Sequence, residues 1–72
     1  MKITTGETYL ICYRRDCGDH FEVETRAIGV CRKGAIKTAR QFLNFASGEE
    51  VVVYRVDIGE GEVYLEWSSA QA

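Results

Sequence analysis

The chain has 72 residues, of which 46% are hydrophobic and 28% are charged, and its formal net charge is -2. This length holds one domain, and the composition is that of a folded globular protein rather than a disordered one. The negative charge argues against a general nucleic-acid binder, because such domains usually carry a clear basic excess.

Nothing in the sequence predicts a membrane or secretory protein. The longest apolar run, residues 9–13, is far shorter than the ~20 residues that span a bilayer. The N-terminus lacks the apolar stretch and the small-residue cleavage site of a secretory signal. We therefore expect a cytoplasmic protein consisting of a single domain, residues 1–72, whose ends at 1–7 and 68–72 fray.

Two strands are expected first. Residues 8–15 are β-branched, aromatic and apolar without a breaker, which predicts a strand that is central in its sheet. A turn follows, in which Gly18 is suited to positive φ. Residues 20–27 alternate with period two, so that Phe21 and Ala27 are expected on the same face. The two strands should form a hairpin.

The pattern then changes to a helical period over residues 33–47. An apolar stripe runs along one side, and a basic face formed by Lys33, Lys37 and Arg40 lies opposite. Gly48 is expected to end this helix. No Ser, Thr, Asp or Asn stands where an N-cap residue is expected.

Residues 50–58 and 62–67 return to period two and predict a second hairpin, with Leu65 and Trp67 on the same face. The element order ββαββ therefore predicts an α+β domain. Its four-stranded antiparallel sheet should have one helix packed on one face, since one helix covers only one side of such a sheet.

The alternation also predicts which residues that helix covers. The strand residues expected in the core are Phe21, Val23, Val52, Tyr54, Val56, Val63 and Leu65. The other face is expected to meet solvent or a partner, and it would carry Glu22, Glu24, Arg26, Val51, Val53, Arg55, Tyr64 and Glu66. This mixture is more apolar than a solvated face requires, and exposed aromatic side chains among charges suit a protein interface. The candidate partner-binding residues are Val51, Val53, Arg55, Glu60, Glu62, Tyr64 and Glu66.

Charge is distributed unevenly along the chain. Residues 28–48 carry four cations and no acid, whereas residues 49–72 carry six acids and one arginine. The basic helix face could contact phosphate, but such faces are common on ordinary solvated helices. We therefore do not expect direct nucleic-acid binding.

The strongest constellation for a metal is Cys12, Cys17, His20 and Cys31. The spacing of these residues lacks the close C-x2-C pair of zinc sites. The three cysteines are an odd number, which is ordinary for free thiols in a reducing compartment. Cys17 and His20 also form a candidate nucleophile pair, but no third orienting residue is evident. The paired carboxylates, such as Glu22 with Glu24, are typical of solvating charge. We expect no metal, no cofactor and no enzymatic activity.

The chain resembles the small phage-encoded anti-CRISPR proteins that inhibit type I systems. The resemblance covers residues 8–67 and lies in the element order, in the helix GAIKTARQFLNFA and in the Val-rich hairpin that closes on EVYLEW. It implies a non-enzymatic protein that binds a CRISPR effector complex in the host cytoplasm, often blocking target DNA through the complex's basic channel. No binding residue is carried over from this family, because no motif is shared.

A second interpretation is an antitoxin-like or other regulatory protein-binding module. The first two strands and the helix are similar to the partial ferredoxin-like fold of small antitoxins, although the chain has no proline and so lacks their proline-glycine turn. A homodimer remains open under either interpretation. A small enzyme that uses Cys17 and His20 ranks last.

Overall fold

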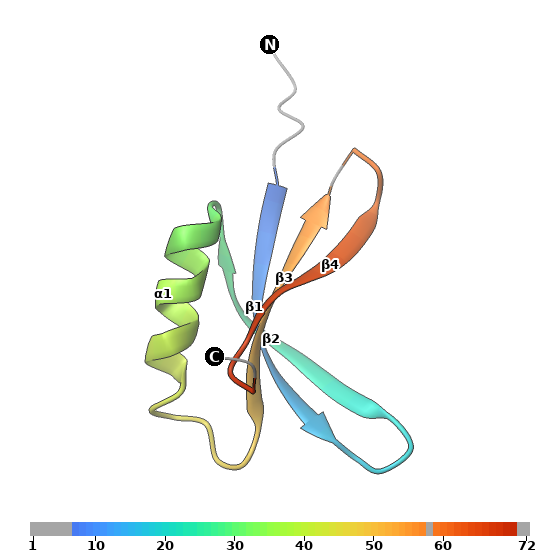
Figure 1. The fold of residues 1–72 in the computed structure, drawn as a ribbon, viewed down its shortest axis with the longest axis vertical. Helices are drawn as coiled ribbons and strands as arrows, with labels where there is room; N and C mark the ends of the chain where they lie inside the picture. Colours follow the sequence, from blue (N-terminus) through green and yellow to red (C-terminus); the bar gives the residue numbers. More distant parts are fainter. Residues whose placement is uncertain (1–6, 58, 71–72) are drawn as a thin grey trace.

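The computed structural model describes residues 7–57 and 59–70 (Figure 1). In these residues, strands β1 (Glu7–Asp16), β2 (Phe21–Gly29), β3 (Glu50–Asp57) and β4 (Glu62–Ser68) form one antiparallel sheet in the order β2-β1-β3-β4. Helix α1 (Arg32–Phe42) packs on one face. The predicted α+β class, the ββαββ order and the central first strand are confirmed. The predicted fraying at 1–6 and 71–72 lies outside the described residues.

The β1–β2 hairpin closes through a hydrogen bond from the Cys17 amide to the His20 carbonyl at 2.9 Å. Gly18 has φ of 97°, as expected, and the Asp16 carboxylate accepts a hydrogen bond from its amide at 2.8 Å. A residue with a side chain is strained at this φ, which explains the glycine. The hairpin projects beyond the helix at one end of the molecule, and the β3–β4 turn projects at the other (Figure 1).

Helix α1 ends at Phe42, short of the predicted end at residue 47. The amides of residues 43–45 donate to carbonyls three residues back, at 3.0–3.3 Å, so the last turn tightens and the helix stops. Gly48 has φ of 80° but lies in the loop before β3, so it does not end the helix as expected. At the start, Cys31 is the N-cap, and its sulfur accepts from the Gly34 amide at 3.4 Å.

The core lies between α1 and the central strands. Ala35 and Ala39 of the helix pack against Tyr9, Ile11, Val51 and Val53, with Tyr13, Ala27, Phe42, Ala46 and Trp67 around them. Small residues bring the backbones close together. A Cβ atom added at Gly29 would lie 3.1 Å from the Cβ of Ala35.

The helix covers the face opposite to the one expected. Val51 and Val53 are both 0% exposed beneath it, so the prediction that they lie on the uncovered face is wrong. Val52, between them, is also 0% exposed and points to the other face. Because β3 carries valine on both faces, its alternation does not reveal which face the helix covers.

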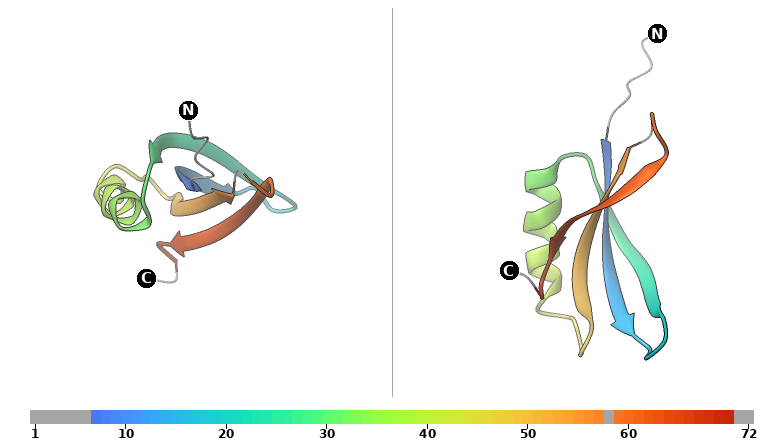
Figure 2. Two further views of the ribbon diagram at one scale, coloured as in Figure 1. Left: turned by 90° about the horizontal axis from the view of Figure 1, so that it is seen from above. Right: turned by 45° about the vertical axis from the view of Figure 1, so that its right-hand side comes forward.

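Two β-bulges explain further errors in the expected faces. Ile11 pairs with Ala27 and Cys12 with Thr25, so Arg26 is an extra residue in β2. Glu66 is the corresponding extra residue in β4. A bulge reverses the alternation beyond it. Ala27 therefore faces the helix while Phe21 faces away, contrary to the prediction. Bulges also increase twist, and the strands cross and fan apart strongly (Figure 2).

The end of β4 makes several hydrogen bonds, and the expected fraying of residues 68–72 stays a prediction. Ser68 is buried, and the Ala70 amide donates to its hydroxyl at 3.1 Å. Ser69 bonds Val51 twice: its amide donates to the Val51 carbonyl at 2.9 Å, and its hydroxyl accepts from the Val51 amide at 3.0 Å. Ser69 therefore extends the hydrogen bonding between β4 and β3 beyond Ser68.

Within residues 7–57 and 59–70, no helix has both the length and the apolar character that crossing a bilayer requires.

Candidate protein-binding site

The sheet face that points away from α1 carries mostly apolar side chains, and we call it the open face. Residues directly opposite one another in adjacent strands share a face, so the strand register defines its members. They are Thr8, Leu10, Cys12, Arg14, Asp16, Phe21, Val23, Thr25, Ile28, Glu50, Val52, Tyr54, Val56, Val63, Leu65 and Ser68.

Five large apolar side chains of the open face are solvent-exposed, and no described element covers them. The exposed fractions are 58% for Phe21, 49% for Val23, 70% for Ile28, 58% for Val63 and 43% for Leu65. They come from the two edge strands, β2 and β4. Apolar side chains gathered on one face, rather than scattered singly, mark interaction surfaces.

The centre of the open face is closed. Cys12 and Val52 pair across the two central strands and are 1% and 0% exposed. The Cys12 thiol lies 3.5 Å from the Thr25 hydroxyl, and burial raises the pKa of this thiol. The open face is therefore tightly packed between its edge strands, and the Cys12 sulfur is not accessible for reaction.

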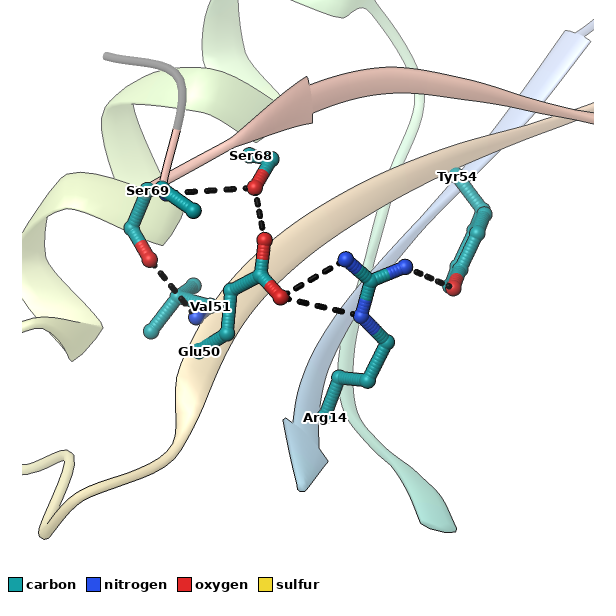
Figure 3. A network of polar contacts seen from close by, with 7 residues as sticks. Arg14, Glu50, Val51, Tyr54, Ser68 and Ser69 are labelled. Atoms are coloured by element: carbon teal, nitrogen blue, oxygen red, sulfur yellow. Dashed lines mark hydrogen bonds and ion pairs between the residues drawn. The ribbon is translucent and has the colours of Figure 1, made fainter. Parts of the chain in front are cut away.

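One end of the open face holds a polar network (Figure 3). The Glu50 carboxylate accepts hydrogen bonds from Arg14 Nε at 3.0 Å and from Arg14 Nη2 at 2.7 Å. Its other oxygen accepts from the Ser68 hydroxyl. Arg14 Nη1 reaches the Tyr54 hydroxyl at 3.5 Å, and the guanidinium lies 4.9 Å from the centre of the Phe21 ring. The two charges neutralise each other within the face.

The pKa of Glu50 reflects this network. Burial acts to raise it, but the hydrogen bonds from Ser68 and Arg14 outweigh burial and hold the pKa below its ordinary value. The carboxylate is therefore charged and already fully engaged, so it is not available as a general base.

Several of the sequence-predicted partner-binding residues gather on the helix side instead. Arg55 Nε donates to Glu66 Oε1 at 2.6 Å, and Arg32 Nε of the helix donates to Glu66 Oε2 at 3.3 Å. Arg55 also lies 4.4 Å from the centre of the Tyr64 ring. Arg55, with Arg32, holds the pKa of Glu66 below its ordinary value. Glu66 thus links the helix to the sheet, and its negative charge is balanced by the two arginines.

The acidic side chains Glu60 and Glu62 lie at the exposed β3–β4 end, where the Tyr64 hydroxyl donates to Glu62. The β1–β2 end is acidic as well, since Asp16, Asp19 and Glu22 are all exposed there. This second acidic end was not expected from the sequence. The signal was present in the spacing of these three acids across one predicted turn.

The basic helix face lies apart from the open face. Lys33, Lys37 and Arg40 are exposed and line a shallow groove along α1 with Arg32, Ile36, Gln41 and Asn44. None of these residues belongs to the sheet, so the basic face and the open face can contact different molecules.

The metal and nucleophile candidates separate in the structure. Cys12 is buried and Cys31 caps α1, whereas Cys17 and His20 lie together with Glu22, their ligand atoms all within 4.8 Å of one another. Asp19 supplies the orienting group that was not evident, 2.6 Å from His20 Nδ1. Loss of hydration and a hydrogen bond to Glu22 raise the pKa of the Cys17 thiol, which disfavours an activated nucleophile.

No protein-family model matches this chain, and neither a curated protein nor a solved structure matches it. The resemblance to anti-CRISPR proteins therefore stays a prediction.

Proposed function

We propose that this chain is a small, non-enzymatic protein-binding module that docks onto a partner protein through the open face. The observation that carries the proposal is the exposure of five large apolar side chains on one sheet face. Burying apolar surface stabilises a complex by roughly 25 cal/mol per Å² before the costs of association are subtracted. Cys12 and Val52 are tightly packed at the centre of the open face and keep this surface rigid, which lowers the entropic cost of binding.

The charges around the open face favour a partner with a basic rim. Acidic side chains lie at both hairpin ends of the sheet, which point in opposite directions (Figure 1). Two copies packed face to face would bring acidic ends near one another, and like charges across an interface are unfavourable. An apolar patch flanked by lysine or arginine on a different protein suits both features, so we propose a heterologous partner rather than a second copy.

An effector complex with a basic nucleic-acid channel is a partner of this chemistry. Occupying such a channel would exclude its nucleic acid, which makes the chain an inhibitor. Two features support a type I CRISPR effector complex as the partner: the resemblance in element order and the acidic ends that flank the apolar surface. The alternative is an antitoxin-like module that binds a different basic protein through the same open face.

The test combines a reconstituted type I effector complex with a matched pair of substitutions. Val23 is on the open face, whereas Val30 is 90% exposed but lies outside it. We expect the wild type to block target DNA binding. Val23→Asp should weaken binding to the complex by about tenfold or more, because it places a charge in the apolar contact. Val30→Asp should bind normally.

Each outcome is informative once normal melting of both variants has been checked. A wild type that neither binds the complex nor protects its DNA would refute the anti-CRISPR assignment. If the wild type and Val23→Asp bind the complex equally well, the open face is not the binding surface. A stable dimer in native mass spectrometry that Val23→Asp dissociates would make a second copy the occupant.

A further inference from the structure

The tip of the β1–β2 hairpin brings together a thiol, an imidazole and a carboxylate. The hydrogen bond between the Cys17 amide and the His20 carbonyl closes the turn, and the pairing of Arg15 with Glu22 brings the start of β2 back alongside the end of β1. One ligand atom each from Cys17, His20 and Glu22 lies within 4.8 Å of the others. We propose that this tip binds a zinc ion through these three side chains.

The three ligand atoms, within 4.8 Å of one another, lie near the spacing that a small tetrahedral ion requires. Zinc bonds of about 2.0–2.3 Å to nitrogen, oxygen and sulfur place neighbouring ligand atoms about 3.3–3.8 Å apart. The three side chains are exposed, so their outer bonds are free to rotate and bring the ligand atoms closer together. Thiolate, imidazole and carboxylate together favour zinc over magnesium or calcium, which prefer oxygen ligands alone.

The neighbouring residue Asp19 prepares His20 for this role. Its carboxylate lies 2.6 Å from His20 Nδ1, which favours the tautomer that donates its Nδ1 proton to Asp19 and keeps its lone pair on Nε2. A carboxylate that holds the other nitrogen of the imidazole is a recurring arrangement at zinc sites, where it fixes the tautomer and raises the basicity of the ligand.

Local charge favours a cation as well. Asp16, Asp19 and Glu22 surround the tip, and Arg15 is the neighbouring cation. Arg15 Nη2 donates to Glu22 Oε1 at 3.1 Å, and the carboxylate has a second oxygen to offer. An incoming divalent ion offsets most of the remaining negative charge.

The site supplies three protein ligands and leaves a fourth position for water. Closed structural zinc sites use four protein ligands, so this one is an exchangeable site on a folded hairpin. The turn is already formed by backbone hydrogen bonds, so the ion is not needed for folding. The site lies on the tip rather than among the apolar side chains of the open face, so a bound ion lowers the negative charge of this acidic end without covering the apolar surface.

The test is a titration of the reduced protein with Co²⁺, a spectroscopic substitute for zinc, followed by displacement with Zn²⁺. We expect one equivalent of Co²⁺ to produce a thiolate-to-cobalt charge-transfer band and the visible bands of a tetrahedral ion, both abolished by Zn²⁺. Cys17→Ser should remove the charge-transfer band. His20→Gln and Glu22→Gln should each weaken binding by at least about tenfold.

Asp19→Asn tests the positioning role, since removing a group that orients a ligand typically weakens metal binding about 10–100-fold. The matched controls are Cys31→Ser, an exposed thiol outside the cluster, and Glu24→Gln, the next acid along β2. Both should bind Co²⁺ like the wild type. The proposal is overturned if the charge-transfer band survives Cys17→Ser, if it disappears in Cys31→Ser, or if the wild type binds no Co²⁺ at micromolar concentrations.

Discussion

Leu65 and Trp67 are two positions apart in β4, yet their side chains lie on opposite faces of the sheet. Glu66 between them is the extra residue of a bulge, so Val53 pairs with Trp67 and Tyr54 with Leu65. Trp67 packs against the core beneath α1, whereas Leu65 is 43% exposed on the open face. A regular strand would have put both on one face.

The bulge predicts different costs for truncating these two side chains. Trp67→Ala should lower the free energy of unfolding by about 2–4 kcal/mol, because it leaves a cavity at the core. Leu65→Ala should cost less than about 1 kcal/mol, because its side chain is already partly hydrated. Urea denaturation of both variants measures the difference, and equal costs would contradict this assignment of faces.

Close packing of β2 on the helix predicts that Gly29 tolerates no larger side chain. A Cβ here would already lie 3.1 Å from the Cβ of Ala35, and Gly29→Val adds two further methyl groups. We expect a loss of about 1–3 kcal/mol, as overpacking typically causes. Ile28→Val, one position away on the exposed open face, serves as the control and should be nearly neutral. A stable Gly29→Val variant would show that the helix can move away from the sheet.

Glu50 and Glu66 predict how stability depends on pH. Both have a pKa held below the ordinary value of 4.5, by Ser68 and Arg14 for Glu50 and by Arg55 and Arg32 for Glu66. The unfolded chain therefore binds more protons than the folded one in acid. The resulting stability is present above about pH 4.5 and is lost as the pH falls through the lower folded pKa values.

Chemical denaturation between pH 7 and pH 3 measures this loss. Glu50→Gln should be less stable than the wild type at pH 7, because it removes the negative charge that pairs with Arg14, and its stability should fall less steeply in acid. Glu24→Gln, whose side chain is exposed, should keep the wild-type slope. Parallel pH profiles for the wild type and Glu50→Gln would contradict the assignment.

The three cysteines should react at two different rates. Cys17 and Cys31 are exposed, whereas Cys12 is buried and its pKa is raised by burial. Ellman's reagent should modify two thiols quickly in the metal-free protein, and the third only as fast as the protein unfolds. Adding denaturant should make all three fast. Equal rates for all three thiols in the folded protein would show that the centre of the open face is accessible.

The sequence predicted much of the fold because its local signals agreed. The element order, both hairpins and the positive φ of Gly18 follow from residue periodicity and turn chemistry. The alternation also placed Phe21, Val52 and Leu65 on one face correctly. It did not show which face the helix covers, because Val51, Val52 and Val53 are apolar without interruption.

The candidate site was harder to predict, because it depends on pairing between distant strands. The sequence of each strand does not reveal its bulge, because Arg26 and Glu66 fit a regular alternation of apolar and polar residues. Val51 and Val53 were expected on the uncovered face, but they are buried in the core beneath the helix. Glu60 and Glu62 do lie at an exposed end, and their role in binding stays a prediction.

The two bulges lie in β2 and β4, the strands at the edges of the sheet. An unprotected edge is a template for further strands, and it is the usual starting point of fibrous aggregation. Here each edge is kinked at a charged residue, Arg26 on one side and Glu66 on the other. A strand approaching from the side therefore meets an interrupted row of amides and carbonyls. Because neither edge strand readily accepts a further strand, the domain can expose an apolar face to water without aggregating by strand addition.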